Sequence, residues 1–270
     1  MLIHKASDLT VIFPVFNESL YNLEKSLDSL LAQTIDFKCL IIDDSTETRI
    51  IEFLIDFTNL HSNFIYIRPP ARLGLPATLN LGISKCSSKY IARFDSDDIN
   101  FPSRFEKQIA FLKSNKSIGV LGTQINLIDA NGKYLRKRHY PINHSSIVRA
   151  MTFVCPLAHP SVMFNVEAFP SKDLLIYSEQ SSCEDLELWM RLIDQGIKFQ
   201  NLNEILLSYR VPLRDLDRPK DHWRSNLLAR QKSFIRKPRL LKIFGILAFS
   251  LISITPMRCI LFFKKLFGLR

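Results

Sequence analysis

The feature that most constrains the fold is a regular alternation, over the first 115 residues, of short apolar runs with longer segments of helical spacing. The apolar runs are rich in β-branched residues, and between them apolar residues recur every three or four positions. The expected strands are 9–15, 37–42, 64–67 and 90–94, and the expected helices are 20–31, 49–57, 76–85 and 102–113. This rhythm predicts an α/β, Rossmann-like fold: a mostly parallel mixed sheet with flanking helices and right-handed crossovers. Ligands of such sheets bind beyond the carboxyl ends of the strands.

The rest of the chain fits one domain with an appendage. Residues 118–128 are a further apolar stretch, and residues 142–209 mix strand and helix patterns. A length of 270 residues with 47% hydrophobic content can bury one full α/β core. We therefore expect a single domain over residues 1–221 and a separate helical tail over residues 222–270.

The net charge of +10 is concentrated in that tail. After Asp221 there is no acidic residue, whereas 11 lysine and arginine side chains follow it, so the preceding part is close to neutral. Residues 243–257 carry no charge, but this apolar stretch is shorter than the roughly 20 residues that a membrane span requires. We expect the tail to lie on an anionic membrane surface, with a true span, or a buried helical hairpin or oligomer contact, as alternatives. Because the basic residues belong to an apolar tail, no nucleic-acid partner is expected.

The five cysteines are scattered and never form a C-x-x-C pair, which indicates reduced thiols. The N-terminal residues lack the pattern of an export signal. We expect the chain to work at the cytoplasmic face of the cell inner membrane, attached peripherally or monotopically.

The strongest local signal is a group of three carboxylates, Asp95, Asp97 and Asp98, directly after the expected strand 90–94. Packing these charges together at a sheet edge is costly without a cation. Carboxylates at alternate positions suit a hard octahedral ion, so the sequence predicts a Mn²⁺ or Mg²⁺ site. The alternative is an exposed acidic loop that caps the following helix.

A second acidic pair, Glu184 and Asp185, begins a segment with helical apolar spacing. A carboxylate in this position can act as a general base on an acceptor hydroxyl. The alternative is ordinary compensation of the helix dipole.

Two weaker signals lie elsewhere. Asp43 and Asp44 end the second expected strand, where they can bind a nucleobase or ribose, or cap the next helix. His159 can face an acceptor or its phosphate, although a lone histidine is often structural.

Taken in order, several motifs make one set. They are Phe13-Pro14-Val15-Phe16-Asn17-Glu18, Ile42-Asp43-Asp44-Ser45, Arg72-Leu73-Gly74 through Asn80-Leu81-Gly82, Phe94-Asp95-Ser96-Asp97-Asp98, and Glu184-Asp185 through Trp189. The set spans roughly residues 8 to 212 and resembles glycosyltransferase family 2, in particular its non-processive members of bacterial O-antigen and capsule synthesis. The resemblance implies a GT-A fold, an inverting reaction and a nucleotide-diphosphate-sugar donor.

The resemblance also implies roles for individual residues. The nucleotide-sugar would be bound by Pro14, Phe16, Glu18, Asp43, Asp44, Arg72 and Asp95; the metal by Asp97 and Asp95; and the acceptor or diphosphate by Glu184, His159 and Arg210. Asp185 would be the catalytic base. Residues 8–115 would then form the nucleotide-sugar half and residues 116–221 the acceptor half of the domain.

The chain departs from the family pattern at two places. Arg72 stands where the family often has asparagine, and no histidine follows Arg210 to complete a metal shell. The Q-x-x-R-W signature of processive synthases is absent as well. We therefore expect transfer of one hexose or N-acetylhexosamine from a UDP-sugar to an undecaprenyl-diphosphate-linked saccharide, with a β-linkage formed. The alternatives are transfer to polyprenyl phosphate itself and a non-catalytic, membrane-bound sugar-nucleotide-binding partner.

Overall fold

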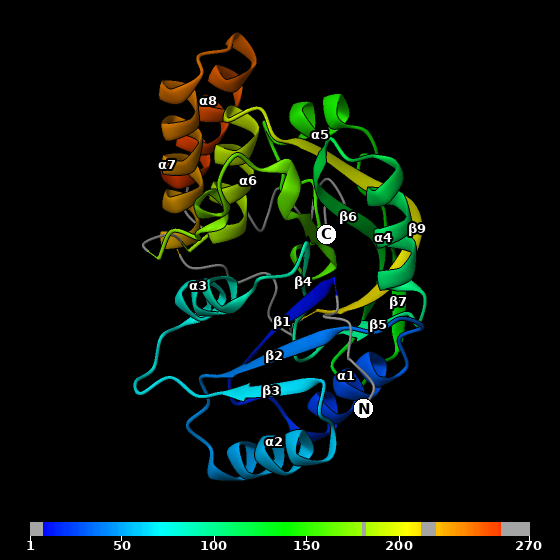
Figure 1. Ribbon diagram of the computed structural model, residues 1–270. Helices are drawn as coiled ribbons and strands as arrows, with labels where there is room; N and C mark the ends of the chain where they lie inside the picture. Colours follow the sequence, from blue (N-terminus) through cyan, green and yellow to red (C-terminus); the bar gives the residue numbers. More distant parts are fainter. Residues whose placement is uncertain (1–7, 180–181, 212–219, 255–270) are drawn as a thin grey trace.

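The computed structural model describes residues 8–179, 182–211 and 220–254, which form a mixed sheet flanked by helices (Figure 1). The strands are β1 Leu9–Val15, β2 Lys38–Asp43, β3 Phe64–Ile67, β4 Tyr90–Arg93, β5 Ile99–Asn100, β6 Ile118–Ile128, β7 Tyr134–Arg138, β8 Met163–Asn165 and β9 Lys198–Arg210. The helices are α1 Leu20–Leu31, α2 Thr48–Leu60, α3 Leu75–Lys85, α4 Arg104–Ser114, α5 His144–Ala150, α6 Glu184–Asp194, α7 Lys220–Arg236 and α8 Leu240–Ile254. Three short 3₁₀ helices are η1 His159–Ser161, η2 Val166–Ala168 and η3 Lys172–Leu175.

The first half of the sheet is parallel, as the alternation predicts. Within the described residues the strand order is β3-β2-β1-β4-β8-β6-β9-β5, with β7 paired to β6 outside this path. Strand β1 pairs with both β2 and β4 in parallel, and β2 pairs with β3 in parallel. The four strands and four helices expected in this part of the chain are all present, with ends that differ by up to three residues.

The second half of the sheet is mixed. Strand β8 is antiparallel to β4 and β6, β7 is antiparallel to β6, and β5 is antiparallel to β9, whereas β6 and β9 are parallel. Of these antiparallel pairs, only β6 and β7 are joined by a short turn, which permits an antiparallel pair, whereas the other antiparallel pairs join strands that are distant in the sequence. The expectation of a mostly parallel sheet holds for strands β1 to β4, and the sheet as a whole is mixed.

Two apolar layers bury the two faces of the sheet. Because side chains alternate along a strand, Val11 and Phe13 of β1 join the layer beneath α1, α2 and α4, whereas Ile12 joins the layer beneath α3 and α6. Trp189 of α6 is fully buried in the second layer. Helix α6, which begins with the second acidic pair, is thus fixed to the sheet by its apolar face.

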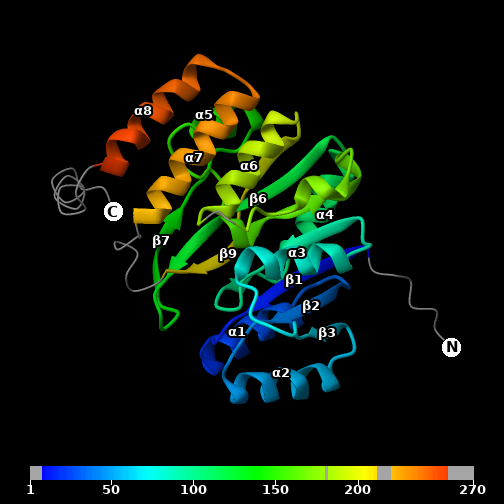
Figure 2. The same cartoon turned by 90° about the vertical axis from the view of Figure 1, so that its left-hand side faces the viewer.

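The last two helices pack on the domain. Figure 2 shows α6, α7 and α8 side by side. Asp194, at the end of α6, accepts hydrogen bonds from Ser233 Oγ (2.8 Å), Arg236 Nε (3.1 Å) and Lys242 Nζ (2.7 Å). Two of the basic side chains of the expected tail therefore serve internal ion pairs.

The outer side of α8 is apolar and exposed. Leu240, Phe244, Leu247 and Leu251 lie at helical spacing and are 61–80% exposed. None of the helices in the described ranges has both the length and the hydropathy to cross a membrane. The rest of the expected tail, residues 255–270, lies outside the described residues.

Candidate active site

The carboxylate of Asp43, at the end of β2, is fully buried and saturated with partners. Its Oδ1 accepts a hydrogen bond from the Ser45 amide (2.9 Å), and its Oδ2 accepts from Tyr66 Oη (2.7 Å) and Arg68 Nη1 (2.9 Å). Burial, followed by the bond to Asp43, raises the pKa of Tyr66 to about 12. Tyr66 of β3 and Arg68, directly after β3, were not identified from the sequence, because a phenolic or basic group there gives no local signal.

Asp44 holds the loop that contains Arg72. Its two carboxylate oxygens accept from the amides of Leu73 and Gly74, each at 2.8 Å. Gly74 has φ 79°, a left-handed conformation that glycine adopts without strain. Asp43, the last residue of β2, and Asp44, which follows it, therefore both hold loops. The alternative that they cap the next helix is wrong, because the N-cap of α2 is Glu47, without a side-chain capping bond.

Phe16 and Arg72 stack at the rim of this region. The Arg72 guanidinium carbon lies 4.2 Å from the centroid of the Phe16 ring, and Phe16 is 44% exposed. Pro14, by contrast, is a buried residue of β1. Of these predicted nucleoside contacts, Phe16 and Arg72 present accessible surface to a ligand.

The loop after β1 is fixed by Asn17 and Glu18. Asn17 has φ 46°, and its Oδ1 accepts from the amide of Thr46 (2.8 Å), which joins the loops after β1 and β2. Glu18 Oε1 accepts from the Ser19 amide (2.8 Å) and from Asn22 Nδ2 (3.0 Å). Asn17 lies in the Phe13–Glu18 motif, but only the folded structure shows that it joins the loops after β1 and β2.

The carboxylates of Asp95, Asp97 and Asp98 converge after β4, with one oxygen of each within 4.8 Å of the others. Asp95 forms an ion pair with the buried Arg93. Asp98 is fully buried; its Oδ1 accepts from the Arg210 amide (2.7 Å), and its Oδ2 has no partner among the described residues. Burial, then Asp95 and then Glu18, raises the pKa of Asp97 to about 7. The alternative of an exposed, helix-capping loop is wrong, because Ser103 is the N-cap of α4.

This cluster fits a divalent cation. The three carboxylates face two buried arginines, Arg93 and Arg104, which leaves one negative charge uncompensated, and the Asp98 oxygen without a partner among the described residues is a further available ligand atom. Oxygen-only ligand sets of this kind are those that Mg²⁺ and Mn²⁺ select.

Arg210, at the end of β9, ties this loop to a neighbouring turn. Its Nε donates to Asp97 O (2.8 Å), and its Nη1 donates to Asp129 O and Ala130 O, each at 2.9 Å. These bonds position the acidic loop. Contact between Arg210 and a leaving diphosphate stays a prediction. The guanidinium nitrogen that would make this contact is Nη2, which does not bond to these three carbonyls.

The second acidic pair lies at the start of α6, as the spacing predicts. Asp185 Oδ1 accepts from the Leu186 amide (2.7 Å) in the first turn, and its Oδ2 accepts from Cys155 Sγ (3.4 Å). Burial, followed by repulsion from Asp185, raises the pKa of Glu184 to about 7. Asp185 thus has one oxygen on the helix N-terminus and the other on the cavity side.

His159 is buried between these two groups. Its Nε2 lies 2.8 Å from Tyr177 Oη, and its ring contacts the Trp189 ring edge-on at 5.7 Å. Burial, followed by the charge of Arg93, lowers its pKa well below the ordinary value. His159 is therefore neutral, and its predicted contact with an acceptor stays a prediction.

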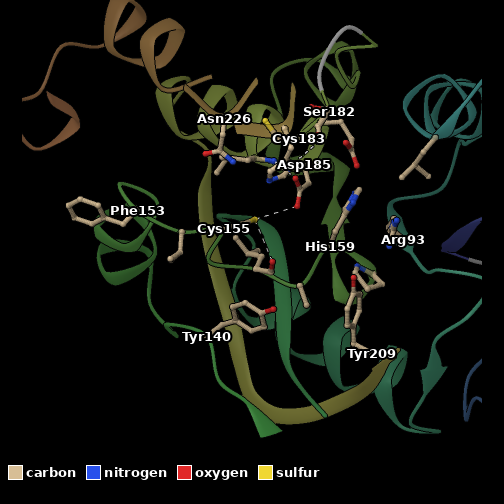
Figure 3. Close-up of a pocket in the computed structure, with 18 of the residues that line it drawn as sticks. Arg93, Tyr140, Phe153, Cys155, His159, Ser182, Cys183, Asp185, Tyr209 and Asn226 are labelled. Atoms are coloured by element: carbon tan, nitrogen blue, oxygen red, sulfur yellow. Dashed lines mark hydrogen bonds between the residues drawn. The ribbon is translucent and has the colours of Figure 1, made fainter. Parts of the chain in front are cut away.

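One cavity of about 470 Å³ joins the two acidic groups. Arg93 and Asp95 line it from the β4 side, and Glu184 and Asp185 line it from α6. Figure 3 shows Asp185 extending into this space, with Arg93 and His159 across from it.

Helices α7 and α8 complete the cavity wall. Trp223 and Asn226 of α7 and Phe249 of α8 line it, and the Trp223 and Phe249 rings lie 6.2 Å apart. These residues were not predicted to line a site, because residues 222–270 were expected to form a membrane-associated tail.

The ends of the parallel strands carry an acidic cluster that fits a divalent cation, and one cavity joins Asp95 of this cluster to a carboxylate on α6. This arrangement agrees with a nucleotide-sugar-dependent glycosyltransferase of the GT-A class. The sequence match narrows this class. The family model described as "Glycosyl transferase family 2" matches residues 10–169, and the chain belongs to that family.

Two curated relatives are similar over most of their length. The O-antigen biosynthesis glycosyltransferase WbnJ of Escherichia coli is 34% identical over 212 residues, which cover 75% of this chain and 79% of WbnJ. The amylovoran biosynthesis glycosyltransferase AmsE of Erwinia amylovora is 30% identical over 205 residues, covering 75% of this chain and 76% of AmsE.

Solved structures share the fold at low sequence identity. S. aureus TarS 1–349 in complex with UDP-GlcNAc aligns with a TM-score of 0.67 at 16% identity, over 90% of this chain and 71% of that one. The chain spans 42% of a longer TarS chain.

Proposed function

We propose that this glycosyltransferase transfers one sugar from a UDP-sugar to a lipid-linked saccharide in surface polysaccharide synthesis. The observation that carries the proposal is the cavity that joins Asp95, of the acidic cluster after β4, to Asp185 on α6. WbnJ and AmsE, named for O-antigen and amylovoran biosynthesis, support the surface-polysaccharide context, and the TarS complex supports a UDP donor.

The donor would lie across the carboxyl ends of β1, β2 and β4. The accessible Phe16–Arg72 stack is suited to the nucleoside, and the loops held by Asp43, Asp44 and Glu18 shape its surroundings. Asp95 and Asp97, with Asp98 beside them, would hold a Mn²⁺ or Mg²⁺ ion. When bound, the ion supplies neutralisation of the diphosphate leaving group.

Asp185 would be the general base. Its Oδ2 is directed to the cavity, where it can accept the proton of an acceptor hydroxyl as that oxygen attacks the anomeric carbon. In-line attack on an α-linked donor inverts the centre and gives a β-linked product. Glu184 and His159 lie near this position on the acceptor side of the cavity.

The acceptor would reach the cavity from a membrane surface. The stripe of exposed apolar residues on α8 belongs to the same helix pair that walls the cavity, and Phe153 and Val154, which also line it, are 50% and 54% exposed. Exposed basic side chains Lys232, Lys237 and Arg239 are close to this stripe in sequence and suit anionic headgroups. This supports a location at the cytoplasmic face of the inner membrane.

A donor and acceptor panel tests the proposal. Purified protein is incubated with UDP-, GDP- and dTDP-sugars and Mn²⁺ or Mg²⁺, with a synthetic sugar-diphosphate-lipid in anionic vesicles. We expect turnover of one UDP-sugar only when both the cation and the saccharide lipid are present. Equal turnover on polyprenyl phosphate alone would replace the proposed acceptor, and selective turnover of a GDP- or dTDP-sugar would replace the proposed donor.

A further inference from the structure

Cys155 is a thiol in the cavity wall that the proposed reaction does not use. It follows the turn after α5, and its single thiol proton has two acceptors in reach, Asp185 Oδ2 at 3.4 Å and Leu157 O at 3.6 Å (Figure 3). Burial, followed by the neighbouring Asp185, raises the pKa of the Cys155 thiol well above its usual value. At neutral pH the thiol therefore keeps its proton and remains a hydrogen-bond donor.

The turn that carries Cys155 is held in place by the two C-terminal helices. Arg230 of α7 donates from Nε to Thr152 O (3.1 Å) and from Nη2 to Met151 O (3.3 Å). Gly245 of α8 packs so closely on this turn that a Cβ atom there would lie 2.5 Å from Thr152 O. The backbone just before Cys155 is therefore held in place by α7 and α8, which fixes the position of the thiol beside the Asp185 carboxylate.

The two oxygens of Asp185 have different partners. The Leu186 amide holds Oδ1, and this bond alone leaves the direction of Oδ2 poorly fixed, because the carboxylate can turn about its terminal torsion. The thiol is the donor that the structure gives to Oδ2. A weak donor suits this position, since it orients the oxygen while leaving it free to accept a proton.

We infer that Cys155 is a positioning residue that aims Asp185 Oδ2 at the acceptor hydroxyl, and that Arg230 and Gly245 fix the turn from which it acts. The inference rests on the proposed role of Asp185 as base. With this role, the residues that affect the reaction include not only the two acidic groups but also Cys155 and the turn before it, which α7 and α8 hold in place.

The test compares three variants of the full-length protein with the same donor, cation and saccharide lipid. For Cys155→Ala we expect kcat to fall about three-fold, the lower end of the effect of losing one hydrogen bond, with KM for both substrates unchanged. Cys155→Ser retains a donor and should recover most of the lost kcat. Cys86→Ala is the matched control, since Cys86 is also a buried thiol that donates to a carbonyl, Gly82 O, but lies outside the cavity lining; its kcat should equal that of the wild type.

Thermal unfolding of each variant separates positioning from packing. A Cys155→Ala protein with lowered Tm but wild-type kcat would overturn the inference, and so would a serine variant no better than alanine. Failure of the proposed function itself looks different, because the wild-type protein would then show no transfer or Asp185→Asn would retain full activity.

Discussion

The acids after β2 and the acids after β4 lie at the ends of two strands that both pair with β1, yet their environments are opposite. Asp43 and Asp44 each accept two or more hydrogen bonds from a phenol, a guanidinium or backbone amides. Asp95, Asp97 and Asp98 face one another, with Arg93 as the ion-pair partner of Asp95. Similar sequence patterns at equivalent strand ends thus produce one saturated pair and one charge-rich cluster.

The difference separates acids that hold the loops of the site from acids that keep the capacity to bind a cation. Saturated carboxylates stabilise loops and have little capacity left for a ligand. Crowded carboxylates destabilise the free protein and are stabilised when a cation arrives, which is typical of sites kept for function. Asp185, with one oxygen on a helix amide and one in the cavity, lies between these cases.

The largest effect is expected at the crowded cluster. Asp97→Asn should lower kcat by about a thousand-fold, because charge stabilisation of the leaving group depends on the cation held there. Transfer assays over a Mn²⁺ concentration series measure this, with Asp28→Asn, an exposed acid of α1, as the control. Full activity of Asp97→Asn would show that the acidic cluster after β4 is not needed for transfer.

Asp185→Asn comes next. We expect kcat to fall by about a hundred-fold or more, because the amide cannot accept the acceptor proton, while donor affinity is nearly unchanged. Calorimetric titration with the donor nucleotide and steady-state transfer rates, measured on the same preparation, check the two parts. Retained turnover would return Asp185 to the role of a helix-terminal acid.

Asp44→Ala tests whether the acids after β2 mainly stabilise loops. Removing a carboxylate that holds two amides should lower the free energy of unfolding by about 1–3 kcal/mol and weaken donor binding through the loop that carries Arg72. Urea unfolding gives the first quantity and donor titration the second. An unchanged urea midpoint would contradict the interpretation that Asp44 stabilises the protein through its hydrogen bonds to the two amides.

The smallest effect concerns Glu184, whose folded-state pKa of about 7 exceeds the ordinary value of 4.5. The folded protein therefore holds this proton more tightly than the unfolded chain, and the resulting stability is present below about pH 4.5 and is lost as the pH rises through 7. Glu184→Gln should consequently raise Tm by a few degrees at pH 8 and have no such advantage at pH 4. Thermal unfolding of the variant and the wild type at both pH values measures this difference in Tm. An equal change in Tm at pH 4 and pH 8 would contradict the raised pKa of Glu184.

The sequence predicts the parts of the fold that local pattern controls. Residues 9–113 alternate clearly, so β1 to β4 and α1 to α4 were predicted together with the acids at their ends. The antiparallel placing of β8 and β5 was not predicted, because three-residue and two-residue strands leave almost no periodicity.

The same limit applies to the site. The acidic cluster and the Glu184–Asp185 pair stand out because charged residues at strand and helix ends are visible in one dimension. Arg68, Cys155 and Trp223 do not stand out, since each acquires its role from a contact with a residue 25 or more positions away or from a cavity wall. Arg210 shows the converse, a residue found by pattern whose guanidinium mainly holds backbone carbonyls.

The wall that α7 and α8 add to the cavity has a consequence for how such enzymes diversify. The family model ends at residue 169, whereas Trp223, Asn226 and Phe249 lie well beyond it. Exchange of this helical pair between relatives would alter one wall of the cavity and leave the strand-end acids untouched. Under the proposed function, such an exchange is expected to change the acceptor that the enzyme uses while the donated sugar stays the same.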